Sequence, residues 1–317
     1  MGDNITFWII FNVFVLLLLG LDLLVFHRKK HEVGIKEALW TSLFWIVLAL
    51  CFNGLIYYWR GEDPAMEFLT GYLIEKSLSV DNLFVFILIF NFFNVPPKYQ
   101  HNLLFWGVLG ALILRGIFIL VGVALISKFH FIIYILGAFL VYTGIKMAFS
   151  GDQDVDPEHN PVVKWVSRHI RMTKTHEEGK FFVRKRGKLY ATPLFLVLIM
   201  IESTDVVFAA DSIPAILAIS NDPFIVYTSN VFALLGLRAL YFALAGIMEL
   251  FHYLKYGLSV ILSFIGVKLL ISDIYHIETK YALIGVGAIL LISVVASLLF
   301  PEEKKDLPSP PEEGQDS

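Results

Sequence analysis

The sequence predicts an all-α, polytopic membrane bundle of about nine transmembrane helices, and three observations carry that prediction. The chain of 317 residues is 57% hydrophobic and only 17% charged, a composition typical of integral membrane proteins. Nine stretches are apolar enough to cross a bilayer, which requires about 20 mostly apolar residues. The third and sixth stretches share a pattern of acidic residues, which indicates an internal repeat.

The predicted spans lie in a single transmembrane domain of residues 1–300. Turn-forming residues mark two of the boundaries, at Val95-Pro96-Pro97 and at Asn221-Asp222-Pro223. The tail 301–317 is polar and rich in proline, so we expect a disordered cytoplasmic segment there. The spans are predicted at roughly 5–27, 36–59, 67–93, 102–126, 130–149, 191–219, 224–248, 254–273 and 281–300.

Basic residues are distributed unevenly between alternate loops. With the N-terminus outside, the inner loops hold 17 Lys and Arg residues and the outer loops hold 3. The positive-inside rule therefore predicts a multi-pass protein with its N-terminus outside and its C-terminus in the cytoplasm. The loop 150–190 holds nine of these basic residues, so we expect it to be cytoplasmic and to contact anionic lipid headgroups.

Two of the spans carry acidic residues at matching spacing. In GYLIEKSLSVDNLFVF (71–86) and IESTDVVFAADSIPAI (201–216), an acid is followed after five residues by Asp and a small polar residue. A carboxylate at membrane depth costs at least about 2.5 kcal/mol, so several together need a compensating cation. The predicted metal ligands are Glu75, Asp81, Glu202, Asp205 and Asp211, with Asn82 and Ser212 as neutral ligands or close neighbours.

The chemistry of this set favours a hard divalent cation. Oxygen ligands suit Mn²⁺, Mg²⁺ and Ca²⁺, whereas the single Cys51 and the lack of membrane-centred histidine argue against Zn²⁺ or Cu⁺. The alternative is that the acids form buried ion pairs with Arg115, Arg238 and Lys76, although three cations cannot balance all of them. Some of these pairs could serve as counter-charges when metal leaves, so Arg115 and Arg238 are predicted to balance charge around the empty site.

Two further residues within the predicted spans, Asp22 and Pro214, bear on the structure. Asp22 lies in the first span near the inner interface, where a structural cap and a place on an access path are both open. Pro214 removes the backbone donor that would bond Ala210, which favours a break in the helix beside Asp211.

The repeat extends beyond the acids. Arg115 in GALILRGIF matches Arg238 in ALLGLRALY, and Tyr134, Gly144 and Lys146 match Tyr256, Gly266 and Lys268 with identical internal spacing. Units of about 67–149 and 191–273 therefore contain three spans each (spans 3–5 and 6–8). An odd number of spans makes the second unit enter from the opposite side, the inverted repeat of many secondary transporters. We expect Lys146 and Lys268, near span ends, to reach the headgroups.

Enzyme motifs are missing from the sequence. It contains no HExxH metal motif, no GxSxG elbow and no nucleotide-binding glycine loop. We therefore expect a protein that is not an enzyme, binds no permanent cofactor and no nucleic acid, and uses an ion gradient or the membrane potential. Proton coupling fits this expectation, because a carboxylate released by a metal readily takes up H⁺.

At these residues the chain resembles the TerC family of membrane proteins, in its Alx-like bacterial branch. The stretches that carry the resemblance are LTGYLIEKSLSVDNLFVF, FVRKRGKLYATPLFLVLIMIESTDVVFAADSIPAI and SNVFALLGLRALYF. The family's members look like manganese exporters related to the LysE transporter superfamily. The family's acidic motif positions correspond to Glu75, Asp81, Glu202, Asp205 and Asp211.

The resemblance implies efflux of a divalent metal, with Mn²⁺ as the transported ion and Ca²⁺ or Mg²⁺ less favoured. The resemblance also implies a place in the bacterial inner membrane, and the direction of transport rests on the resemblance alone. Two alternatives stay open: a metallation partner that delivers Mn²⁺ to secreted proteins beside a secretion translocase, and a tellurite-resistance membrane protein or enzyme.

Overall fold

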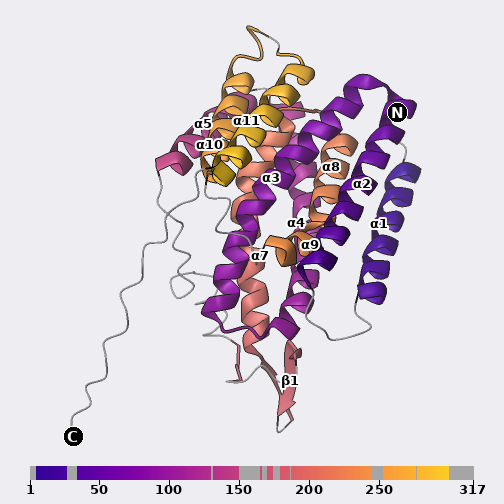
Figure 1. Ribbon diagram of the computed structural model, residues 1–317, viewed down its shortest axis with the longest axis vertical. Coiled ribbons are helices and arrows are strands. Elements are labelled where there is room, and N and C mark those ends of the chain that lie inside the picture. Colours follow the sequence, from indigo (N-terminus) through magenta and orange to yellow (C-terminus); the bar gives the residue numbers. More distant parts are fainter. Residues whose placement is uncertain are drawn as a thin grey trace, which may run out of the picture.

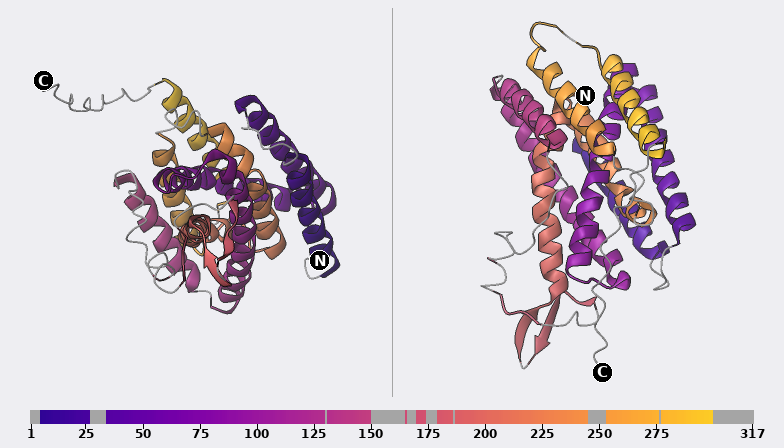
Figure 2. Two further views of the ribbon diagram at one scale, coloured as in Figure 1. Left: turned by 90° about the horizontal axis from the view of Figure 1, so that it is seen from below. Right: turned by 60° about the vertical axis from the view of Figure 1, so that its left-hand side comes forward.

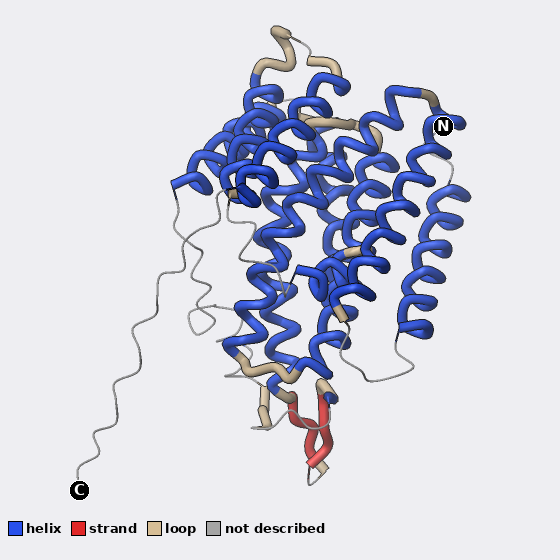
Figure 3. The backbone as a smooth tube through the Cα atoms, viewed as in Figure 1, coloured by secondary structure: helices blue, strands red, loops and turns tan. Residues whose placement is uncertain are grey.

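A computed structural model describes residues 5–26, 34–129, 131–149, 165, 170–173, 179–185, 187–244, 253–275 and 277–299. Helices dominate the described chain (Figure 3). The predicted disordered tail and most of the basic loop 150–190 lie outside the described residues. The helices are α1 (Ile5–Phe26), α2 (Ile35–Arg60), α3 (Glu62–Phe92), α4 (Pro97–Lys128), α5 (Ile132–Phe149), α7 (Pro193–Leu217), α8 (Pro223–Leu235), α9 (Leu237–Leu244), α10 (Leu254–Leu270) and α11 (Thr279–Leu299).

The chain is an α-helical, multi-pass membrane protein. Six helical segments of the described chain are long and apolar enough to span a bilayer: most of α2 and of α4, then α5, α7, α8 with α9, and α11. Each of the nine predicted spans coincides with a helical segment, and α8 and α9 together occupy the seventh. The count of nine membrane crossings stays a prediction, as does the orientation of the termini.

Four helices, α3, α4, α7 and α8, form the centre of the bundle, where α3 packs on α7 and α8, and α4 packs on the same two helices. On one side lie α1 and α2, and on the other lie α5, α10 and α11 (Figures 1 and 2). Aromatic rings of α1, α2, α3 and α8 interlock through Phe11, Phe52, Phe68 and Phe232. Because large apolar side chains are exposed around the outside, the surface suits contact with lipid.

Proline marks where three of the helices begin. Pro97, Pro193 and Pro223 each stand in the first turn of a helix, where a missing backbone donor breaks no hydrogen bond. Asp222 caps α8, because its Oδ1 accepts from the backbone N–H groups of Phe224 and Ile225 at 2.9 and 3.3 Å. The turns predicted at 95–97 and 221–223 are confirmed.

The helix break predicted beside Asp211 was wrong. α7 continues through Pro214 to Leu217, and Pro214 is buried in the bundle. Packing on neighbouring helices holds the helical path there despite the lost backbone bond. The interruption lies instead at Gly236, which separates α8 from α9 two residues before Arg238.

A β-hairpin precedes α7, and the sequence analysis did not predict it. β1 (Phe182–Lys185) pairs antiparallel with β2 (Lys188–Ala191), with Phe182 opposite Ala191 and Lys185 opposite Lys188. Gly187 in the turn has φ +75°, a backbone conformation that glycine adopts without a Cβ clash. The hairpin projects from the end of the bundle where α7 begins (Figure 1). Its strands are short and basic, so the sequence predicted only a basic loop there.

Glycines bring α5 and α10 into backbone contact. A Cβ added at Gly144 would lie 2.7 Å from the Ser259 carbonyl oxygen, and one added at Gly266 would lie 2.7 Å from the Gly137 carbonyl oxygen. Ser259 Oγ also donates to the Gly144 carbonyl at 2.6 Å. In the repeat, Gly137 corresponds to Ser259 and Gly144 to Gly266, in each case 122 positions later. Each contact therefore joins one of these positions on α5 to the counterpart of the other on α10. Residues 137 and 144 meet 266 and 259 respectively, so the two helices run antiparallel.

The headgroup contact expected for Lys268 was wrong. Its side chain is 7% exposed, and its Nζ donates to the Ala218 carbonyl at the end of α7, at 3.4 Å. A lysine at a helix C-terminus is stabilised by the last carbonyl groups and the helix dipole. Lys146, its counterpart in the repeat, is exposed at the end of α5.

Candidate functional site

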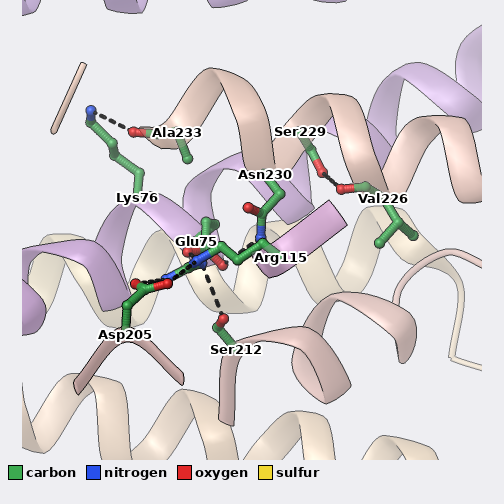
Figure 4. A network of polar contacts seen from close by, with 9 residues as sticks. All are labelled: Glu75, Lys76, Arg115, Asp205, Ser212, Val226, Ser229, Asn230 and Ala233. Carbon is green, nitrogen blue, oxygen red and sulfur yellow. Dashed lines mark hydrogen bonds and ion pairs between the residues drawn. The ribbon is translucent and has the colours of Figure 1, made fainter. Parts of the chain in front are cut away.

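A single arginine joins the two acidic spans at the centre of the bundle. Arg115, on α4, donates from Nη1 to Glu75 Oε1 on α3. Its Nη2 donates to Asp205 Oδ1 on α7 at 2.9 Å, and its Nε donates to Asp205 Oδ2 at 3.3 Å. Figure 4 shows the guanidinium between the two carboxylates. Glu75 and Asp205 hold the same position in the two acidic motifs, so the repeated acids meet at one cation.

Two neutral side chains complete this group. Ser212 Oγ on α7 accepts from Arg115 Nη1 at 3.3 Å, and Asn230 Nδ2 on α8 donates to Glu75 Oε2 at 3.1 Å (Figure 4). We call these five residues, Glu75, Arg115, Asp205, Ser212 and Asn230, the central cluster. All four central helices contribute to it.

The central cluster is sealed from solvent. The exposed fractions are 0% for Glu75, 1% for Arg115 and 2% for Asp205. Two carboxylates and one guanidinium leave a formal charge of −1, which is costly at membrane depth. Every carboxylate oxygen accepts a hydrogen bond, so the geometry stabilises the charges that are present.

The other two acids of α7 are Glu202 and Asp211. The Glu202 carboxylate packs against Gly110 of α4, where an added Cβ would collide with it. Its Oε2 is buried and has no hydrogen-bond partner within the described part of the chain. Asp211 is half-buried, six residues beyond Asp205 on the same helix. Along α7, Glu202 therefore lies about one turn before Asp205, and Asp211 lies between Asp205 and Ser212.

The remaining predicted residues are placed only in part. The side chains of Asp81 and Asp22 lie outside the described residues, although their backbones belong to α3 and α1. Asn82 is buried on α3, two turns beyond Glu75. Arg238 is buried in α9, but the hydrogen bonds to Glu75 and Asp205 come from its counterpart Arg115.

Among the side chains that the structure describes, no three His, Cys, Asp or Glu groups come together where they could hold a metal ion. At the centre, Arg115 lies between the carboxylates of Glu75 and Asp205 and bonds both. The role of the five acids as metal ligands therefore stays a prediction.

The comparisons with known proteins agree with the motifs. The model of the integral membrane protein TerC family matches residues 60–306, most of the chain. The chain belongs to the TerC family. It is 51% identical over 297 residues to a Salmonella typhi protein named provisionally as a membrane-bound redox modulator, Alx, covering 91% of this chain and 92% of that one. The Escherichia coli K12 protein of the same name is 50% identical over 297 residues, covering 91% and 92%.

A further relative carries no assigned role. An uncharacterized membrane protein of Myxococcus xanthus is 47% identical over 292 residues, with 92% of each chain covered. No solved structure matches this TerC-family chain.

Lys76 neighbours the central cluster without joining its acids. Its Nζ donates to the Ala233 carbonyl in the last turn of α8 at 3.2 Å (Figure 4). The same amine lies against Gly236, where an added Cβ would be 2.8 Å from it. Lys76 therefore caps the end of α8 at the break before α9, where a positive charge is favoured. The sequence left open a buried ion pair between Lys76 and one of the acids, and among the described residues Lys76 bonds the Ala233 carbonyl instead.

A second polar group lies where α7 ends and α8 begins. Arg60 and Asp222 form an ion pair of 2.5 Å, and Ser220 Oγ donates to Glu67 Oε2 at 2.6 Å. Lys268 is within electrostatic reach of Glu67. We call these residues, Arg60, Glu67, Ser220, Asp222 and Lys268, the end cluster. It lies two turns of α3 or more from Glu75, and Gly71 between them packs against Ser229 of α8.

Two residues at or beside the site were not predicted from the sequence to belong to it. Asn230, an amide within an apolar span and two turns before Arg238, was a recognisable signal. Gly110 gave no such signal in the sequence, because the lack of a side chain matters there only where the Glu202 carboxylate packs against it in the fold.

Proposed function

We propose that this TerC-family chain is a secondary transporter that exports a divalent metal cation from the cytoplasm, with Mn²⁺ as the first candidate. The observation that carries the proposal is the meeting of Glu75 and Asp205, from two acidic spans, at one buried cation. Buried acids in membrane helices are expensive and mark ion pathways. A site where matching positions of two repeats converge is where secondary transporters bind their cargo.

The cargo is a hard cation on chemical grounds. The central cluster presents four carboxylate oxygens, the Ser212 hydroxyl and the Asn230 amide oxygen, and it contains no sulfur or imidazole. Such oxygens suit Mn²⁺, and they also accept Ca²⁺ and Mg²⁺. Glu202 and Asp211 extend the acidic lining along α7, and Asp81 lies on α3 at the position that matches Asp211. They supply further oxygens for a cation that enters or leaves the centre.

Alternating access fits a bundle of about nine spans built on an inverted repeat. The reciprocal contact between α5 and α10 supports that architecture, because it pairs Gly144 with Ser259 and Gly137 with Gly266. Antiparallel helices related in this way suit a two-fold axis in the membrane plane. Motion of one unit against the other would expose the central cluster to each side in turn. The positive-inside distribution supports an N-terminus outside and a C-terminus in the cytoplasm of a bacterial cell.

The relatives' provisional name, redox modulator, does not require thiol chemistry in this chain. Cys51 is the single cysteine of the sequence, and it is exposed on α2 away from the central cluster. A disulfide within one chain is therefore impossible. Export of Mn²⁺, a redox-active metal, gives a route by which such a membrane protein alters redox balance. It also accommodates delivery of the metal to secreted proteins.

The proposal is tested by the Mn²⁺ content of bacterial cells that lack their own Mn²⁺ exporters. Cells that express the native chain should hold less Mn²⁺ than cells that express Glu75→Gln or Asp205→Asn at matched membrane levels. Glu278→Gln is the matched control, because Glu278 is exposed at the start of α11 and pairs only with the neighbouring Lys280 among the described ion pairs. Equal Mn²⁺ content in all four strains and in empty cells would contradict export.

A further inference from the structure

We propose that Arg115 is a tethered substitute for the cargo: in the cation-free transporter its guanidinium pairs with both Glu75 and Asp205 and offsets one of their two negative charges, which lets the carrier reorient without metal. The proposal rests on the function proposed above. It assigns Arg115 a role in the transport cycle that goes beyond general charge balance, because it separates net transport from exchange.

The hydrogen bonds of the central cluster make the guanidinium and a metal mutually exclusive. Arg115 bonds Glu75 Oε1 and both oxygens of Asp205, and Asn230 bonds the remaining Glu75 Oε2. A metal that coordinates Glu75 and Asp205 together would have to displace Arg115 from between them. All three guanidinium nitrogens take part, so the group is held as a planar fork in the manner of a bound ligand.

Charge provides the second argument. Without Arg115, two carboxylates with exposed fractions of 0% and 2% would face each other at membrane depth. Lys76, the adjacent cation on α3, directs its amine to the Ala233 carbonyl instead. An arginine stays protonated throughout the accessible pH range, so its neutralising effect is permanent. Whenever the site is closed, the acids therefore need a compensating positive charge from Arg115, the metal or bound protons, and Arg115 is the one that the structure shows.

The consequence is a distinction between net transport and exchange. With Arg115 present, the carrier releases metal on one side and returns empty, because the guanidinium takes the place of the cargo. Without Arg115, the empty form bears two uncompensated buried charges and its return is slow. Such a variant would return only with another metal bound, and it would behave as an obligatory exchanger.

The experiment uses the full chain, purified with Mn²⁺ present and reconstituted into liposomes. Net flux is followed as Mn²⁺ entry into vesicles that contain a fluorescent chelator, and exchange as uptake of radiolabelled Mn²⁺ into vesicles filled with unlabelled Mn²⁺. For Arg115→Gln, net flux should fall at least about tenfold, whereas exchange should stay within about threefold of native. Arg115→Lys, which keeps the charge, should recover part of the net flux. Arg60→Gln, which removes an arginine from the end cluster, should match the native chain in both assays.

The contrary outcomes are distinct. Native net flux in Arg115→Gln overturns the proposal, and so does loss of both fluxes in a folded, monodisperse variant. A native chain that moves Mn²⁺ only when the metal is present on both sides also overturns it. A native chain that moves no divalent cation in either assay refutes the proposed function itself.

Folding of the variant gives an independent readout. If Mn²⁺ and the guanidinium substitute for each other, added Mn²⁺ should raise the thermal stability of Arg115→Gln more than that of the native chain. A variant that is not recovered in folded form even with Mn²⁺ present shows that the metal cannot replace Arg115, which overturns the proposal.

Discussion

The central cluster and the end cluster each join an arginine to an aspartate on a different helix, and they differ in burial. Arg115 and Asp205 have side chains that are 1% and 3% exposed, whereas those of Arg60 and Asp222 are 20% and 23% exposed. Their donor–acceptor distances are similar, at 2.9 and 2.5 Å. Distance alone therefore does not distinguish the two pairs. Burial decides how much each charge depends on its partner, because water screens the exposed pair and cannot reach the buried one.

The largest effect is expected from removing the buried cation alone. Arg115→Met should lower the free energy of unfolding by about 3–5 kcal/mol, because it leaves Glu75 and Asp205 uncompensated. Arg60→Met should lower it by less than about 1 kcal/mol. Unfolding of both variants by SDS titration in mixed micelles, without added metal, measures the difference. Equal losses would show that burial does not separate the two clusters.

A second change removes all the charges of the central cluster together. The combination of Arg115→Met, Glu75→Gln and Asp205→Asn should unfold within about 2 kcal/mol of the native chain, because neutral groups of similar size need no counter-charge. Mn²⁺ flux should nevertheless be abolished. The same SDS titration and the liposome assay report the two properties separately. If the triple variant is as unstable as Arg115→Met, the lost stability comes from packing and not from uncompensated charge.

At the end cluster the expected loss of stability is smaller than that for Arg115→Met. Asp222→Ala should lower the free energy of unfolding by about 1–2 kcal/mol, mainly because the cap of α8 is lost. The Arg60–Asp222 pair adds little in water, and salt screens it. Asp222→Asn should keep most of the stability, since its side-chain oxygen can still accept from the backbone N–H groups of Phe224 and Ile225. If Asp222→Asn and Asp222→Ala lose the same amount, the ion pair rather than the cap is the main contribution.

Several features were predictable because they depend on local chemistry. Apolar runs gave the helical segments, and proline at a first helical turn gave the starts of α4 and α8. The acids stood out because a charge inside an apolar run is unusual. The hairpin escaped prediction because its strands have four residues each and alternate only weakly. The helix break predicted from Pro214 was wrong because the prediction considered the lost backbone hydrogen bond and not the packing around Pro214.

By itself the sequence determined the membrane class of this protein, its family motifs and the set of acids that have to find a cation. Only the tertiary structure decided which cation Glu75 and Asp205 meet. Of the three candidates, Arg115 takes Glu75 and Asp205, while Lys76 caps α8. The physical reason is the separation of the interacting residues along the chain. A helical pattern depends on neighbours a few residues apart, whereas a hydrogen bond between helices depends on how distant parts of the chain pack. Glu75, Arg115 and Asp205 come from three helices, so their meeting is a property of the fold.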